Sequence, residues 1–129
     1  MLENLSIKNF VIVDHLELNF KSGFSALTGE TGAGKSILIG ALSLALGQRG
    51  NNGVVRHNTD KSDISATFNI QDNKNAQEWL KQNELESDED NLFLRRVIYQ
   101  DGKSKGFING IPATINQLKS IGELLIDIY

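Results

Sequence analysis

A glycine-rich segment constrains this sequence more than any other feature. It consists of Gly29, Glu30, Thr31, Gly32, Ala33, Gly34, Lys35 and Ser36, and it matches the pattern G-x-x-x-x-G-K-[S/T]. A short apolar stretch, residues 24–28, precedes it, and an apolar run from Ser36 to Leu46 follows. This order predicts a strand, a tight loop and a helix, which is the context that a P-loop requires.

The residue types in the predicted loop suit the binding of phosphate. Gly29, Gly32 and Gly34 allow successive backbone N–H groups to turn toward an anion, and the helix, expected to begin near Gly34, adds its positive dipole end. The charge of Lys35 can reach the β- and γ-phosphates, which makes it the candidate catalytic residue. The Ser36 hydroxyl can bind Mg²⁺. We therefore expect residues 29–36 to bind a nucleoside triphosphate together with magnesium.

Hydrophobic patterns predict an α/β domain around this loop. Alternation of apolar and polar residues predicts strands, and the dipeptides Asp101-Gly102 and Asn109-Gly110 predict turns. Leu5 and Ile7 begin the first expected strand. The other expected strands cover residues 16–20, 24–28, 64–70, 92–99, 106–111 and 124–129. The expected helices cover Ser36 to Leu46, which we expect to be enclosed and to stop at Gly47, residues 75–82, and a segment capped by Thr114 that includes Ile115, Leu118 and Ile121.

Composition narrows the class of protein without naming a partner. The chain has 129 residues, a formal charge of -3 and no cysteine. The charge gives no overall basic field, so any contact with nucleic acid must come from a local patch. No run approaches the roughly 18 to 20 apolar residues of a membrane span, and no signal peptide is evident, so we expect a cytoplasmic location without a membrane anchor.

Several phrases around the loop occur together in one known family. They are Ile7-Lys8-Asn9-Phe10, the loop with Leu27 and Thr28 before it, Leu46-Gly47-Gln48-Arg49, Leu94-Arg95-Arg96-Val97 and Phe107-Ile108-Asn109-Gly110. With them, the chain resembles the opening of the RecN family, bacterial DNA-repair proteins of the SMC-like branch of ABC ATPases. The resemblance spans nearly the whole chain.

The resemblance implies a fold, cofactors and partners. Residues 1–129 would form the N-terminal lobe of an ATPase head, with ATP and Mg²⁺ bound at the P-loop. The implied partners are the C-terminal lobe of the same protein, a second head in an ATP-sandwiched dimer, and DNA bound by the complete, nucleoid-associated protein. The coiled coil, the signature motif and the catalytic glutamate of such a protein would lie outside this chain, so the chain alone should hydrolyse little ATP.

Other charged residues have less certain roles. Asp127 follows an apolar run and is a candidate ligand of the magnesium shell, although the resemblance implies that it leads into a glutamine-containing loop. The resemblance makes Arg49 a candidate phosphate contact, while a solvated loop arginine is the alternative for it and the favoured reading for Arg56. A basic stretch of Arg95, Arg96, Lys103 and Lys105 could contact a DNA backbone or could simply be a solvent-facing hairpin. His15 and His57 lack partners at the spacing of metal ligands.

Two other functions remain open from the sequence. A small-molecule kinase would use the same phosphate-binding loop, although no lid or acceptor-site motif follows it. A non-catalytic lobe would instead dock a partner lobe through the apolar segment at residues 124–129.

Overall fold

The computed structural model describes residues 2–19, 32–49, 52–87 and 89–126. These residues form one six-stranded sheet in the order β2-β1-β3-β4-β5-β6, in which every neighbouring pair is antiparallel. The strands are β1 (Leu2–Phe10), β2 (Val13–Asn19), β3 (Lys61–Asn69), β4 (Asn91–Tyr99), β5 (Ser104–Ile108) and β6 (Ile111–Ala113). The helices are α1 (Gly32–Ala45), the short 3-10 helix η2 (Asn52–Val54), α2 (Lys74–Gln82) and α3 (Ile115–Ile126).

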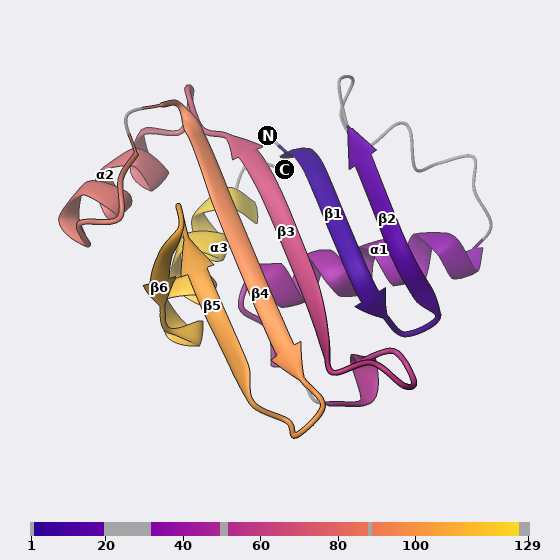
Figure 1. Ribbon diagram of the computed structural model, residues 1–129. Helices are drawn as coiled ribbons and strands as arrows, with labels where there is room; N and C mark the ends of the chain where they lie inside the picture. The colour runs from indigo at the N-terminus through magenta and orange to yellow at the C-terminus, as the bar shows by residue number, and fades with distance from the viewer. Residues whose placement is uncertain (1, 20–31, 50–51, 88, 127–129) are drawn as a thin grey trace.

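The sheet has one face covered by helices and one face that no described helix covers (Figure 1). Side chains alternate between the two faces along each strand, so β3 and β4 send alternate apolar residues toward the helices. We call the covered side the inner face and the opposite side the outer face. Helix α1 contacts β1, β3 and β4, whereas α3 contacts β5. The buried core on the inner face includes Ile7, Ile64, Ala66, Leu92, Leu94, Ile98, Leu38, Ala41, Leu118 and Ile121.

Local hydrogen bonds explain where the helices begin and end. Gly47 follows α1 with φ +92°, and the amides of Gly47 and Gln48 donate to the carbonyls of Leu44 and Ser43. This is the Schellman arrangement that satisfies the last carbonyls of a helix. At the start of α3, the Thr114 hydroxyl accepts from the Gln117 amide, while the Gln117 side chain accepts from the Thr114 amide, as in a capping box. The predicted stop at Gly47 and the predicted cap at Thr114 are therefore confirmed.

Glycines let α3 approach α1 and β5 closely. A Cβ added to Gly122 would lie 2.8 Å from the Leu46 carbonyl oxygen, and one on Gly106 would lie 2.7 Å from a methyl group of Leu118. Gly47 faces α3 in the same way. Side chains at these positions would force the elements apart, so the glycines set the spacing of this layer.

The structure confirms most of the predicted elements and corrects three details. Residues 124–126 belong to α3, so the predicted strand over 124–129 is wrong for this part. The predicted strand over 106–111 is divided by a turn at Asn109 and Gly110, both with positive φ, and Ile111 begins β6. Helix α1 is not enclosed on all sides, because Ile39 is 52% exposed. The predicted strand at 24–28 lies outside the described residues.

We expect Gly47→Ala to reduce the free energy of unfolding by roughly 2 to 5 kcal/mol, because it adds both backbone strain and a clash. The added Cβ would lie 2.4 Å from the Lys119 amide nitrogen, which belongs to backbone and cannot rotate away. Gly102→Ala is the matched control, since Gly102 has the same φ of +92° but nothing within 4 Å of an added Cβ. It should cost only about 1 kcal/mol. Equal losses in urea unfolding would contradict the proposed packing of α1 against α3.

Candidate phosphate-binding site

The first turn of α1 is built from residues of the predicted P-loop. The helix begins at Gly32, two residues before the expected start, so its first turn contains Gly32, Ala33, Gly34 and Lys35. The first N–H groups of a helix have no acceptor within the helix, and they carry the positive end of its dipole. No acidic residue occurs in this turn, and Ser36 is exposed directly after it. A helix start of this kind is suited to an anion.

The inner face of the sheet fixes the direction of α1. Leu38, Ala41 and Leu44 are buried against the sheet. On the same side, the tip of the Phe10 ring lies 3.9 Å from the position that a Cβ on Gly40 would occupy, so the ring packs on the helix backbone. Burial of these apolar groups stabilises the packing of the helix on the sheet. The N-terminal end of α1 is therefore held in one orientation by contacts along its length.

Arg96 fixes the opposite end of α1. Its side chain is on β4, and the residue is 3% exposed. One guanidinium nitrogen, Nη1, donates to the carbonyl oxygens of Leu44 at 2.9 Å and Gln48 at 2.7 Å, and Nε donates to the Ser104 hydroxyl at 3.2 Å. Burial lowers the pKa of Arg96, yet a guanidinium remains charged at neutral pH. A positive charge thus lies at the negative end of the α1 dipole and joins it to the β4–β5 hairpin.

The segment after α1 returns to the turn between β1 and β2. Val11 in this turn has φ +54°, which is strained for a β-branched residue. Its amide donates to the Val54 carbonyl at 2.7 Å, and the Arg56 amide donates to the Asn9 carbonyl at 2.9 Å. The Arg56 side chain reaches Asp14 at 3.3 Å. These bonds hold residues 54–56 against the turn and compensate for its strain.

The structure separates the predicted site residues into distinct places. Gly29, Glu30, Thr31 and Asp127 lie outside the described residues, whereas Gly32 to Ser36 are together at the start of α1. Arg49 follows the other end of α1, which is about 20 Å away along a helix of this length. Its contact with a phosphate stays a prediction. Within the described ranges, no group of three or more His, Cys, Asp or Glu residues could hold a metal ion.

The predicted basic stretch is divided between the two faces of the sheet. Arg96 points inward, but Arg95 points outward and forms two hydrogen bonds with Asp63, at 3.0 Å and 2.6 Å. Lys105 is on the outer face near Tyr99, and Lys103 is at the hairpin tip beside Asp101. Sequence reasoning missed the buried role of Arg96. The sequence pattern does indicate this burial, because Arg96 shares the even-numbered positions of β4 with Leu92, Leu94 and Ile98.

Comparison with known proteins places this arrangement in a family. The family model described as AAA domain matches residues 4–127. The chain belongs to the AAA domain family. Its full length is also 49% identical to the DNA repair protein RecN of Vibrio cholerae, but it spans only 23% of that relative.

Solved structures show the same fold at lower sequence identity. The lobe matches a structure from work on ATP-driven dimerisation and DNA-stimulated activation of SMC ATPases with a TM-score of 0.74 and 23% identity. The match covers 97% of this chain and 79% of the other. The recombination mediator protein RecF, solved with ATPγS, matches with a TM-score of 0.62 and 19% identity, over 97% of this chain and 29% of that one. The predicted fold, an α/β lobe of an SMC-type ATPase head, is confirmed.

No helix in the described part of this AAA domain is long and apolar enough to cross a membrane.

We expect Arg96→Met to destabilise this AAA domain by about 2 to 4 kcal/mol, because it removes the three guanidinium hydrogen bonds that join β4 to Leu44, Gln48 and Ser104. Arg95→Met is the matched control on the opposite face. Arg95 is half-exposed, and its ion pair with Asp63 should contribute less than about 1 kcal/mol. Chemical denaturation of both variants measures the difference. A loss for Arg95→Met as large as that for Arg96→Met would contradict the assigned role.

Proposed function

We propose that this chain is the ATP-binding N-terminal lobe of a RecN-like, SMC-type ATPase that acts in the recombinational repair of DNA double-strand breaks. The observation that carries the proposal is the start of α1 inside the Gly29 to Ser36 motif, where backbone N–H groups and a helix dipole meet. The high identity to the DNA repair protein RecN supports the same function over that of a small-molecule kinase. In this proposal the C-terminal lobe and a second ATP-bound head complete the site, and the complete protein engages DNA.

Each residue of the proposed site has a separate task. The amides of residues 29–34 surround the phosphates, Lys35 neutralises charge on the β- and γ-phosphates, and Ser36 supplies a hydroxyl for Mg²⁺. When bound, the Mg²⁺ ion would be held in part by the Ser36 hydroxyl and would balance phosphate charge. The packing of α1 on the sheet and the Arg96 contacts keep the N-terminal end of α1 in place while the ligand binds.

We expect Lys35→Ala to weaken Mg-ATP binding at least tenfold, since it removes the cation of the motif while leaving the backbone amides. Isothermal titration calorimetry measures the affinity, and circular dichroism checks that the fold is retained. Lys81→Ala is the matched control, because Lys81 is an exposed lysine in the last turn of α2. Unchanged affinity in Lys35→Ala would reject the site assignment.

We also propose that the 129-residue chain alone turns over ATP slowly. Hydrolysis by P-loop ATPases needs a group that orients the attacking water and an acidic residue in the magnesium shell, in addition to the phosphate loop. The resemblance assigns these groups to segments outside this sequence. A phosphate-release assay, run on protein that binds ATP in calorimetry, should therefore detect little turnover. Rapid turnover that Lys35→Ala abolishes would contradict this division of tasks.

A further inference from the structure

The outer face of the sheet carries a row of aromatic and cationic side chains that the nucleotide site does not use. On β3, β4 and β5, alternation places a defined set of side chains on this face. The set comprises Lys61, Asp63, Ser65, Thr67, Phe93, Arg95, Val97, Tyr99, Lys105 and Phe107. Helices α1 and α3 lie behind the sheet in Figure 1, so none of the described helices covers this set. We call it the outer-face row.

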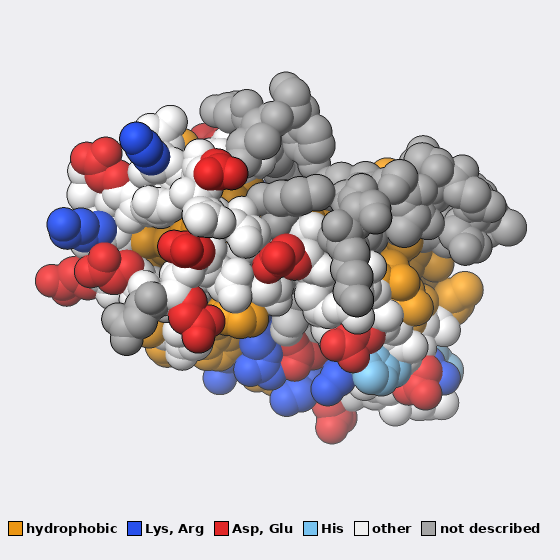
Figure 2. Space-filling view, turned by 90° about the horizontal axis from the view of Figure 1, so that it is seen from above, with side chains coloured by type: hydrophobic (Ala, Val, Ile, Leu, Met, Phe, Trp, Pro, Cys, Tyr) orange, Lys and Arg blue, Asp and Glu red, His pale blue; other side chains and the backbone are white. Residues whose placement is uncertain are grey.

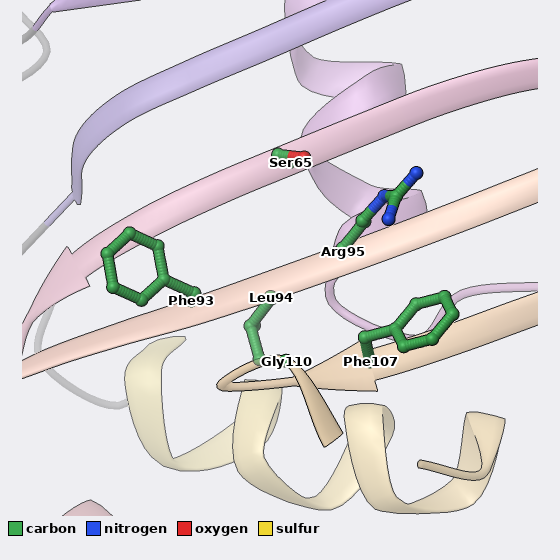
Figure 3. Close-up of a pocket in the computed structure, with 6 residues that line it drawn as sticks. All are labelled: Ser65, Phe93, Leu94, Arg95, Phe107 and Gly110. Carbon is green, nitrogen blue, oxygen red and sulfur yellow. The ribbon is translucent and has the colours of Figure 1, made fainter. Parts of the chain in front are cut away.

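Two aromatic residues of this row, Phe93 and Phe107, line a hollow. Phe93 is 49% exposed, and no cation of the described residues is placed over its ring. The hollow has a volume of about 450 Å³, and its lining residues are Ser65, Phe93, Leu94, Arg95, Phe107 and Gly110. Figure 3 shows Phe93 and Phe107 projecting from neighbouring strands on either side of the Leu94–Gly110 region. Two rings near an open hollow provide faces on which a flat ligand group can stack.

Hydrogen bonds hold the backbone of Phe93 in position. The Phe93 amide donates to the Asn109 side-chain oxygen at 2.9 Å, and the Asn109 amide donates to the Phe93 carbonyl at 2.8 Å. The Asn109 side chain also donates to the Leu85 carbonyl. The turn between β5 and β6 therefore fixes the backbone of Phe93. A ring on a fixed backbone loses little conformational entropy when a ligand binds.

The cations of the row are likewise arranged around aromatic rings. The Arg95 guanidinium lies 5.3 Å from the centre of the Phe107 ring, and Lys61 and Lys105 lie 6.0 Å and 5.6 Å from the centre of the Tyr99 ring. Val97 is only 2% exposed although it points outward, so neighbouring side chains pack over it. The cations of this face are thus exposed to solvent and lie beside aromatic rings.

The charge of the row differs in sign from that of the chain. The chain has a formal charge of -3, but Asp63 is the one carboxylate among three cations on the outward positions of β3, β4 and β5. Figure 2 shows most Lys and Arg side chains along the lower rim, where the outer face lies, with several acidic and His side chains between them. Asp63 also orients Arg95 through its two hydrogen bonds. The row therefore favours an anionic partner.

Rings and cations together select one class of anionic partner. An acidic peptide would satisfy the cations but would leave the exposed Phe93 ring without a flat group to stack on. Duplex DNA presents phosphates but keeps its bases paired inside. A single strand presents both unpaired bases and phosphates, and surfaces that bind it combine aromatic faces with positive charge.

We propose that the outer-face row binds single-stranded DNA, with bases stacked on Phe93 and Phe107 and phosphates near Lys61 and Lys105. The choice of DNA over RNA rests on the proposed function in DNA repair. The surface itself is separate from the phosphate loop, since it lies on the sheet face opposite α1. Binding should therefore occur without ATP. It should weaken with salt, because cations contribute to it.

The test is fluorescence anisotropy of the intact protein with labelled dT20, without nucleotide, at 50 and 200 mM salt. Phe93→Ala should weaken binding roughly tenfold and Phe93→Trp should retain it, because stacking needs only an aromatic face. Lys105→Glu should weaken binding and reduce the salt dependence. Lys81→Glu is the matched control, since it makes the same charge change on α2, away from this face, and should leave the affinity unchanged.

Several outcomes would overturn the proposal. They are no binding of dT20 at low salt, equal affinity for a matched duplex, tighter binding of rU20 or of a polyglutamate peptide, and identical affinities for wild type and Phe93→Ala. Measuring ATP affinity alongside dT20 affinity distinguishes this proposal from the proposed nucleotide site. Phe93→Ala should keep its ATP affinity, and Lys35→Ala should keep its dT20 affinity. A failure confined to ATP binding would reject only the nucleotide site.

Discussion

The buried guanidinium of Arg96 is the interaction on which the arrangement of this lobe depends most directly. It satisfies carbonyl oxygens at the C-terminal end of α1 and also bonds to Ser104 on β5, so one side chain joins the helix to the β4–β5 hairpin. A buried charge is costly unless several hydrogen bonds compensate for its desolvation. Here the helix carbonyls supply that compensation. The position of one end of α1 then constrains the phosphate-facing end, because a helix of this length is rigid along its axis.

Most of the fold could be predicted because its signals are local. The alternation at Ile64, Ala66 and Phe68 marks β3, and Gly47 marks the end of α1, where only a positive φ closes the helix. The Asn109-Gly110 dipeptide marks a tight turn. In each case the sequence determines a backbone conformation over a few residues. The P-loop motif is of the same kind, and its second half lies where the pattern requires, at the start of a helix.

The predictions from the sequence are wrong where one sequence pattern fits two different structures. Residues 124–129 form a short apolar run, which suits a buried strand or a buried helix equally well. The spacing of Leu118, Ile121 and Leu125 distinguishes them, because these buried residues continue the period of α3. The pair Arg95 and Arg96 was treated as one basic patch, but adjacent residues in a strand point to opposite faces. Charge counted along the sequence therefore overestimated the positive surface and concealed the helix contact of Arg96.

Because side chains alternate along β4, the two faces of this strand carry side chains with different roles. Leu92, Leu94, Arg96 and Ile98 face the helices and support α1, whereas Phe93, Arg95 and Tyr99 face away from them. The two sets share a backbone but no side-chain contact is needed between them, so substitutions on one face can leave the other intact. A ligand on the outer face could still influence α1, because any shift of β4 would move Arg96 and the carbonyls that it binds. Strand β4 is thus the element that the outer face shares with the support of the helix that begins in the phosphate loop.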